Sequence, residues 1–164
     1  MFRTGREHVS ARRAIAADVA EIVRLRQVMF DALGWDDGSE PWPAACAEVL
    51  QSGLTDGSIV AFVVDRQEGG GLASAGVGTV AQRLPGPGNP TGRYGFVQSM
   101  ATDPGHRRRG HGAAVFTALV GWFKAEGLTA VDLHASPDGE GLYRSFGFRE
   151  GEHVELGWRT RHDA

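Results

Sequence analysis

The chain has only one cysteine, Cys46, among its 164 residues. A lone cysteine cannot form an internal disulfide, and it excludes the cysteine pairs that hold structural zinc. No stretch reaches the roughly 18 apolar residues that a membrane-spanning helix needs, and the first residues, MFRTGREH, lack the apolar core of a secretory signal. We therefore expect a cytoplasmic protein that does not associate with a membrane.

An excess of positive charge is also missing. Lys and Arg number 17 against 20 Asp and Glu, which gives a formal net charge of −3. Domains that bind nucleic acid usually present a basic face or stripe. The single basic cluster, at 106–109, has no such stripe around it. We therefore predict no nucleic-acid partner.

The length and the glycine content describe the chain further. A chain of 164 residues suits one domain, and we interpret residues 1–164 as a single domain whose first eight residues are disordered. Glycine numbers 24 of 164, about twice the ~7% of an average protein. Most of these glycines lie between apolar segments, so the sequence predicts many turns.

Apolar periodicity predicts strands and helices in mixed order along the chain. Such an order is typical of a mixed sheet that carries helices on both faces. The predicted strands are 9–14, 58–66, 72–82, 94–102, 128–135 and a last one from 148 that includes 154–158, and the predicted helices are 16–34, 44–52, 110–126 and 142–146.

The segment from 100 to 115 joins a predicted strand to a predicted helix through a loop rich in Arg and Gly. The first amides of a helix lack partners within it and lie at the positive end of its dipole, so they attract anions. Gly110 and Gly112 let the backbone approach a ligand closely, and Arg107–Arg109 offer forked donors for phosphate oxygens. The loop therefore predicts a pyrophosphate site; an exposed basic turn is the alternative.

A second glycine pattern, Gly76-Val-Gly-Thr-Val-Ala81, imitates the dinucleotide-binding fingerprint Gly-x-Gly-x-x-Gly/Ala. That fingerprint binds phosphate only between a strand and a helix. Here LPGPGNP follows, and no helix can begin there. The same run lacks the Gly-Lys-Ser/Thr ending of a nucleoside-triphosphate loop. We predict neither kind of nucleotide site.

The strand, loop and helix around 100–115 resemble the GNAT superfamily of acetyl-CoA-dependent N-acetyltransferases. Its central signature, Arg/Gln-x-x-Gly-x-Gly/Ala after an apolar strand and a proline, is similar to Asp103-Pro104-Gly-His-Arg107-Arg-Arg-Gly110-His-Gly112. The resemblance is strong over 94–148 and weak before it. It implies an α/β (α+β) fold with a mixed, mostly antiparallel central sheet, helices on both faces and splayed central strands.

The resemblance also implies acetyl-CoA as the co-substrate. In the family the loop amides take the pyrophosphate, and the strand before the loop splays from its neighbour, which frees backbone groups for the pantetheine arm and the acetyl carbonyl. The residues that we expect to contact the cofactor are Met100, Ala101, Thr102, Arg107, Arg108, Arg109, Gly110, His111, Gly112, Ala113 and Ser136.

A second family signature, Asn-x-x-Ala-x-x-Leu/Phe-Tyr-x-x-x-Gly-Phe, resembles the stretch from Ser136 to Phe148. Ser136 replaces the asparagine and Gly139 the alanine; a serine can still hydrogen-bond the pantetheine arm. The resemblance implies that Tyr143 is the general acid that protonates the leaving thiolate. A phenol with a pKa near ~10 is protonated at neutral pH and can donate to a thiolate of pKa about 8.5. A tyrosine that only packs its ring is the alternative.

An amine acceptor must lose a proton before it attacks, because an ammonium group has no lone pair. His134 has the most suitable intrinsic pKa, and with Tyr143 it forms our pair of catalytic candidates. Glu40 and Asp31 are carboxylate alternatives, and loss of the proton through water is equally open. A purely structural His134 is the other interpretation.

The segment 34–43, GWDDGSEPWP, combines two tryptophans with three acidic residues. One interpretation is an exposed connector whose tryptophans pack on the helices. The other is a wall of the acceptor site, in which aromatic and acidic groups hold a cationic amine. We expect direct transfer to a small-molecule or peptide amine, although no pattern names the acceptor.

Two further hypotheses concern metal and catalysis. His106 and His111 lie in the loop, but no third ligand follows at the spacing of a metal site, so we predict no metal. A non-catalytic acyl-CoA-binding sensor or interaction module on the same fold is the second functional hypothesis, motivated by the departures at Ser136 and Gly139 and by the lack of an obvious base. GNAT proteins often pair, so the resemblance makes a homodimer one expected assembly.

Overall fold

The computed structural model of the chain describes residues 8–160. We predicted disorder for residues 1–8, and residues 1–7 of this range lie outside the described residues. The chain divides into two compact units with a boundary between His134 and Ala135, and each unit is described by itself. Our interpretation of residues 1–164 as one domain stays a prediction.

The first unit is built on a five-stranded sheet with the order β1-β2-β3-β4-β5. Strands β1 to β4 pair antiparallel, and β5 pairs parallel to β4. The predicted mixed, mostly antiparallel sheet is confirmed, with shorter edge strands than the sequence patterns indicated. The strands are β1 (Arg12–Arg13), β2 (Ile59–Asp65), β3 (Leu72–Gln82), β4 (Arg93–Thr102) and β5 (Val131–Leu133).

Three helices of the first unit pack on this sheet. α1 ends as predicted at Gly34, whose φ of +66° lies in the left-handed region that favours glycine. α2 begins two residues before its predicted start. Pro43 suits the first turn, because proline lacks a backbone N–H and the first amides of a helix have no partner within it. These helices are α1 (Val19–Leu33), α2 (Trp42–Asp56) and α3 (His111–Ala125).

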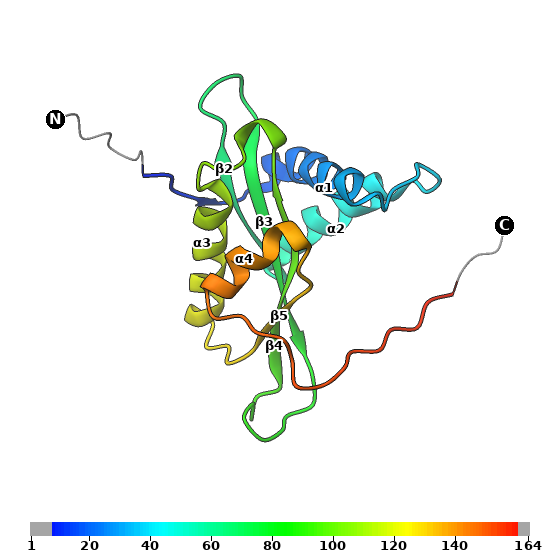
Figure 1. Ribbon diagram of the computed structural model, residues 1–164, viewed down its shortest axis with the longest axis vertical. Helices are drawn as coiled ribbons and strands as arrows, with labels where there is room; N and C mark the ends of the chain where they lie inside the picture. Colours follow the sequence, from blue (N-terminus) through cyan, green and yellow to red (C-terminus); the bar gives the residue numbers. More distant parts are fainter. Residues whose placement is uncertain (1–7, 161–164) are drawn as a thin grey trace. The chain divides into compact units, whose positions relative to one another are not determined.

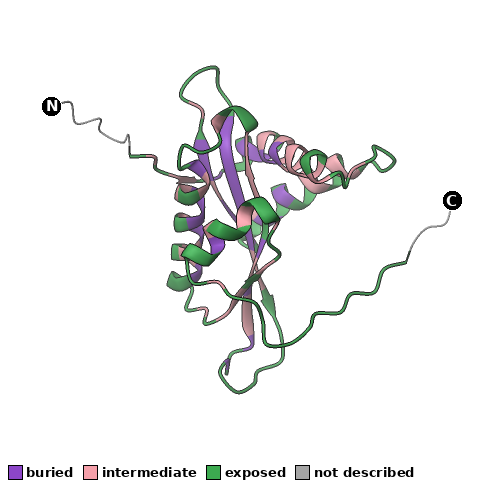
Figure 2. Cartoon of the chain, in the orientation of Figure 1, coloured by how far each residue is buried: buried purple, intermediate pink, exposed green. Residues whose placement is uncertain are grey.

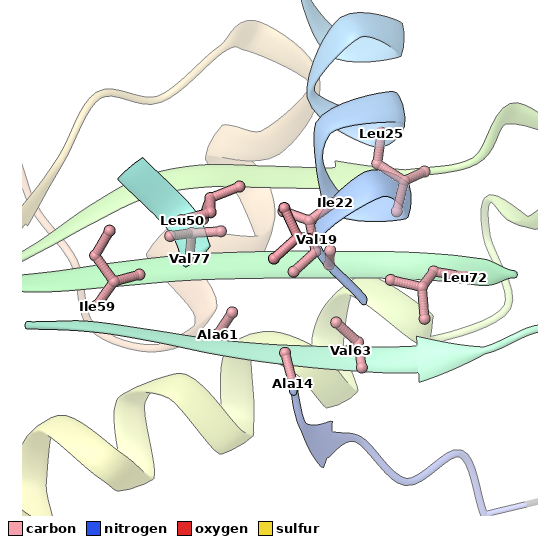
Figure 3. Close-up of a cluster of buried hydrophobic side chains, with 11 residues drawn as sticks. Ala14, Val19, Ile22, Leu25, Leu50, Ile59, Ala61, Val63, Leu72 and Val77 are labelled. Carbon is pink, nitrogen blue, oxygen red and sulfur yellow. The ribbon is translucent and has the colours of Figure 1, made fainter. Parts of the chain in front are cut away.

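Helices cover both faces of the sheet, as predicted (Figure 1). β2 alternates its side chains between the two faces: Ile59, Ala61 and Val63 pack with α1 and α2, whereas Val64 packs with Val115 of α3. Figure 3 shows the first cluster, with side chains of α1 and Leu50 of α2 gathered over β2 and β3. Burial of each larger aliphatic side chain stabilises the fold by about 1.5–3 kcal/mol.

Two glycines of β3 allow α3 to lie close to the sheet. A Cβ atom on Gly76 would lie 2.6 Å from Val115 Cγ1, and one on Gly78 would lie 2.7 Å from Phe123 Cζ. Both glycines stand in the middle of β3, not between a strand and a helix. The pattern that imitates a dinucleotide fingerprint is therefore a packing requirement of the α3–β3 contact.

The pairing of β4 changes partway along the strand. β5 pairs only with Gly95–Val97. At that point β4 also bulges at Gln98, because Val97 pairs with Gly78 and Ser99 with Val77. Beyond the bulge, within the described residues, β4 is paired in the sheet with β3 alone. The far end of β4 thus lies beyond its pairing with β5, as splayed central strands require.

The second unit contains α4 (Pro137–Ser145). The helix begins five residues before the predicted 142, because the Ser136 side chain caps it by accepting a hydrogen bond from the Gly139 amide at 3.3 Å, and Pro137 suits the first helical position. Figure 2 shows most of the described chain after α4 as exposed.

The predicted last strand is wrong. Residues 148–160 form neither helix nor strand, and Val154, Leu156 and Trp158 are 85%, 89% and 82% exposed. Their apolar alternation resembles that of a strand. However, a strand exists only where a neighbouring strand supplies hydrogen-bond partners for its backbone, and this segment has none within the described residues.

Candidate active site

The loop between β4 and α3 has the strand–loop–helix order that the sequence predicted. A short 3-10 turn, Pro104–His106, follows β4, and α3 begins at His111. Gly110 has a φ of +82°, and Arg108 has a φ of +62°, which is rare for a residue with a side chain. Strained backbone of this kind concentrates at functional sites. The loop therefore holds a specific conformation that an unstrained surface turn would not need.

The start of α3 faces open space. No atom lies within 4 Å of the position that a Cβ atom on Gly110 would occupy. The first helical hydrogen bond runs from the Ala114 amide to the Gly110 carbonyl at 3.0 Å. The amides before it, from His111 to Ala113, are those that a helix leaves without partners inside it. The arrangement suits a bound anion, because these amides and the helix dipole present positive charge.

Asp103 ties the start of the loop to two other elements. Its amide donates to the Ala73 carbonyl at 2.8 Å, and its carboxylate accepts hydrogen bonds from Arg66 and, at 3.4 Å, from Arg24 of α1. Burial opposes ionisation of Asp103, but the two arginines outweigh it and hold the pKa of this carboxyl below its usual range. Asp103 is therefore a charged anchor at neutral pH.

Arg24 is itself held by several partners. It donates to Glu21 at 2.6 Å and to the Leu72 carbonyl at 3.1 Å, while Glu21 accepts from the Leu72 amide at 2.9 Å. The loop entry, α1 and the start of β3 are thus joined in one polar network. The sequence analysis missed Arg24 and Arg66, because no local spacing links either of them to Asp103.

The loop forms one wall of an open pocket. The N-terminal segment, the β2–β3 turn and residues of the first turns of α3 line it as well. The pocket lies within the first unit. Its lining residues are His8, Val9, Ser10, Ala11, Gln67, Glu68, His106, Arg108, Arg109, Gly110, His111, Ala113, Ala114, Thr117 and Ala118.

Two histidines meet in the wall of this pocket. The rings of His106 and His111 lie edge to face with centroids 6.0 Å apart. His111 is only 8% exposed, and the Nδ1 atoms of both rings are buried without a hydrogen-bond partner. Burial, followed by the charges of His106 and Arg109, lowers the pKa of His111 below its usual value. His111 is therefore a neutral imidazole at neutral pH.

The three predicted cofactor residues of β4 lie just before the loop. Met100, Ala101 and Thr102 pair with β3 on one side and belong to the part of β4 that lies beyond its pairing with β5. Ser74 of β3 donates to the Ala101 carbonyl at 3.1 Å, and its hydroxyl lies 3.0 Å from that of Thr102. Backbone groups on the β5 side of this segment are outside the sheet ladder within the described residues.

An arginine of α1 contacts the bulge in β4. Arg26 Nη1 donates to the Gln98 carbonyl oxygen at 3.1 Å, and its guanidinium lies 4.7 Å from the centre of the Phe30 ring. The carbonyl that the bulge turns away from the sheet is therefore satisfied by a side chain. The sequence analysis missed Arg26 as well, because a bulge has no signal in this strand pattern.

The acidic and aromatic segment after α1 is ordered by Asp36. Its carboxylate accepts from Trp42 Nε1 at 2.8 Å and from Gln27 Nε2 at 2.7 Å, and these bonds lower the pKa of Asp36. Trp42 packs edge-on against Phe30 at 5.2 Å, as the connector interpretation expects. Trp35 is 71% exposed, although its ring also stacks on Phe30 with centroids 6.1 Å apart.

The two catalytic candidates have contrasting surroundings. His134 follows β5, is exposed, and lies edge-on to Phe96 of β4 with ring centroids 5.3 Å apart. Tyr143 of α4 is 9% exposed, and burial raises the pKa of its hydroxyl above the usual value. Tyr143 is therefore protonated throughout the neutral range, as a proton donor must be.

Two broader features concern metal sites and membrane spans within residues 8–160. No group of three or more His, Cys, Asp or Glu side chains in this part of the chain is placed to hold a metal ion. None of its helices combines the length and the apolar character needed to cross a membrane.

Comparison with solved structures supports the fold. A crystal structure of a predicted acetyltransferase with acetyl-CoA from Clostridium acetobutylicum matches with a TM-score of 0.80 and 21% identity, covering 91% of this chain and 96% of that one. A GCN5-related N-acetyltransferase from Ralstonia eutropha matches with a TM-score of 0.80 and 24% identity, covering 92% and 98%. An aminoglycoside acetyltransferase from an uncultured soil metagenomic sample, in complex with sisomicin, matches with a TM-score of 0.68 and 17% identity, covering 93% and 96%.

Comparison of sequences identifies the family. No curated protein sequence matches the chain. The profile of the acetyltransferase (GNAT) family, in contrast, matches residues 24–148. The matched region runs from α1 to the end of the second signature and includes the whole loop between β4 and α3. Because this profile matches most of the chain, the chain belongs to the GNAT acetyltransferase family.

Proposed function

We propose that this protein is an N-acetyltransferase that transfers the acetyl group of acetyl-CoA directly to a primary amine of a small molecule or peptide. The observation that carries the proposal is the start of α3. There a strained loop and a glycine facing open space precede amides that the helix leaves without partners, and Arg108 and Arg109 line the adjoining pocket. These groups fit the pyrophosphate of a coenzyme A molecule.

The end of β4 beyond its pairing with β5 supports the same proposal. Extended ligands often bind by adding to the free edge of a strand, where backbone groups give affinity without side-chain contacts. The segment Met100–Thr102 offers such an edge directly before the phosphate loop. A pantetheine arm, which carries amide groups of its own, suits this edge. The solved acetyltransferase from Clostridium acetobutylicum, which shares the fold, was crystallised with acetyl-CoA.

Acetyl transfer requires two proton movements. The amine nitrogen forms a bond to the acetyl carbon as the carbon–sulfur bond breaks; the amine loses a proton and the leaving sulfur gains one. In our proposal Tyr143 supplies the proton to the sulfur, because burial keeps its hydroxyl protonated. His134, one of the carboxylates Glu40 and Asp31, or a water molecule accepts the proton of the amine.

A cationic amine is the acceptor class that we propose. The segment after α1 leaves Asp37 and Glu40 exposed beside the exposed Trp35, and carboxylates with an aromatic face attract ammonium groups. The structural neighbour that holds sisomicin is an aminoglycoside acetyltransferase, so the shared fold is compatible with an amine of this kind. Family membership also leads us to propose a homodimer, which sedimentation velocity can test.

The test combines binding with turnover. Calorimetric titration with acetyl-CoA, coenzyme A and ATP should show binding of the two coenzyme A compounds alone. A screen of polyamines, aminoglycosides and peptides should then release free thiol from acetyl-CoA with at least one amine. Binding without any transfer would favour the sensor hypothesis instead. Absence of binding by the folded protein would overturn the proposed function.

A further inference from the structure

We propose that His111 is a proton-coupled phosphate receptor: when a phosphate group enters the pocket before α3, the imidazole takes up a proton from solvent and binds the phosphate as an imidazolium. The proposal rests on the proposed function, because it assigns the ligand to the same loop. The site is otherwise made of backbone amides and arginines. His111 would add to it a side chain whose charge changes when the ligand binds.

The position of His111 is the first argument. It is the first residue of α3, where amides without helical partners attract an anion. Its side chain is 8% exposed and lines the pocket, yet its Nδ1 atom has no hydrogen-bond partner. Buried polar atoms are nearly always hydrogen-bonded in native proteins. An unpartnered ring nitrogen in the wall of a pocket therefore indicates a group that a ligand completes.

The charges around His111 are the second argument. Arg109 and His106 face it from the loop, and together with burial they disfavour its protonated form in the free protein. Arg108 from the loop, Glu68 from the β2–β3 turn and His8 from the N-terminal segment complete the charged or titratable lining. A phosphate group brings negative charge next to His111. This charge favours the protonated form of the ring over the neutral form, so the imidazolium becomes the favoured form.

The chemistry of the lining favours phosphate over a metal ion. Asp103, the acidic residue nearest to His106 at 3.7 Å, already accepts from Arg24 and Arg66. In the described residues no third ligand accompanies the two histidines. A cation would also face the positive end of α3 and two arginines, whereas a phosphate finds donors in the arginines of the loop and the first amides of α3. The geometry therefore selects an anion.

Proton counting tests the proposal. The wild-type protein is titrated with dephospho-coenzyme A near neutral pH in buffers of different ionisation enthalpy, because this ligand keeps the pyrophosphate and lacks the monoester that titrates at about pH 6. The apparent heat should vary with the buffer and report uptake of up to about one proton per ligand. The dissociation constant should rise with pH, by up to about tenfold per unit.

Variants and probes assign the proton. His111→Asn should bind more weakly and abolish the uptake, whereas His153→Asn, which changes an exposed histidine of the C-terminal segment, should preserve it. Pantetheine, which has no phosphate, should bring about no proton uptake in the wild-type protein. If pantetheine matched the coenzyme, the proton would belong to another part of the site.

The two proposals fail in different ways. If the wild-type heat is the same in every buffer although dephospho-coenzyme A binds, the proton coupling of His111 is wrong and the proposed function stands. If no coenzyme A compound binds to the folded protein, both are wrong. Because the proton count uses the wild-type protein, misfolding of His111→Asn would leave the test valid.

Discussion

The backbone of Gly139 lies against the phenol ring of Tyr143 within α4. A Cβ atom on Gly139 would lie 3.0 Å from Tyr143 Cε2 and 3.3 Å from its hydroxyl oxygen. Ordinary van der Waals contacts between such atoms are longer, about 3.5–4.0 Å. Glycine stands where the family signature has alanine, so this departure from the signature lets the ring of Tyr143 lie closer to the helix than an alanine would allow.

The first prediction concerns Gly139→Ala. The added methyl group should displace the Tyr143 ring by a few tenths of an ångström and lower kcat about tenfold, since misplacement by ~1 Å can cost about a hundredfold. Steady-state kinetics with acetyl-CoA and the best amine measures the effect. Gly141→Ala is the matched control, because no atom lies within 4 Å of its Cβ position. It should keep full activity and stabilise α4 by up to about 1 kcal/mol. Equal kcat in both variants would contradict the prediction.

The second prediction concerns Tyr143→Phe. Loss of the hydroxyl should lower kcat by about 10²–10⁴, the usual contribution of a general acid, and leave acetyl-CoA affinity nearly unchanged. Single-turnover kinetics and calorimetry separate the two quantities. Unchanged kcat would show that Tyr143 only packs its ring.

The third prediction follows from the raised pKa of Tyr143. A general acid works while protonated, so activity that depends on Tyr143 falls only as pH rises through its pKa. Burial shifts that pKa above the usual value for a tyrosine, about 10. The kcat profile of the wild-type protein should therefore show no loss attributable to this residue below about pH 10. A descending limb near pH 8 or 9 that Tyr143→Phe removes would oppose this assignment.

The fourth prediction concerns Gly110→Val. A β-branched residue at a φ of +82° should destabilise the protein by about 1–2 kcal/mol, and its side chain should fill the space before α3. Binding of coenzyme A should be lost. Gly127→Val has a similar φ of +75° and equally open space around its Cβ position, so it should lose similar stability and keep its affinity. Calorimetry with thermal unfolding compares the pair. Normal binding by folded Gly110→Val would remove the loop from the site.

The fifth prediction concerns Asp103→Asn. The pKa of Asp103 is lower in the folded protein than in the unfolded chain. Its charge therefore stabilises the fold at pH values above the unfolded pKa. This contribution is lost as the pH falls through the folded pKa. At neutral pH the variant should lose about 1–3 kcal/mol, and near pH 3, below the usual pKa of a free Asp, its difference from the wild type should be smaller. Urea unfolding at both pH values measures this.

A matched control accompanies Asp103→Asn. Asp132 is exposed and lies 3.6 Å from Arg83, so Asp132→Asn should change stability by no more than about 0.5 kcal/mol. Coenzyme A should also bind more weakly to Asp103→Asn, because its loop loses an anchor. Equal stability of the two variants at neutral pH would show that the Asp103 network contributes little.

Elements set by local residue patterns could be predicted well. The bounds of β3 agree with the predicted 72–82, and α1 ends at Gly34 as expected. The helix start after Gly110 was also predicted correctly. In each case the determining interactions lie within the element itself or in the residue that ends it. The strand predicted over 154–158 failed because a strand depends on a partner elsewhere in the chain.

The candidate site divides in the same way. The sequence alone determined the strand–loop–helix order around Gly110, the arginines beside it and the family signature, because these are relations between neighbouring residues. Only the tertiary structure revealed that Arg24 and Arg66, 79 and 37 residues from Asp103 in the chain, hold the loop entry. It also brought His106 and His111 edge to face. Such contacts depend on how the elements pack together, and no local spacing encodes that packing.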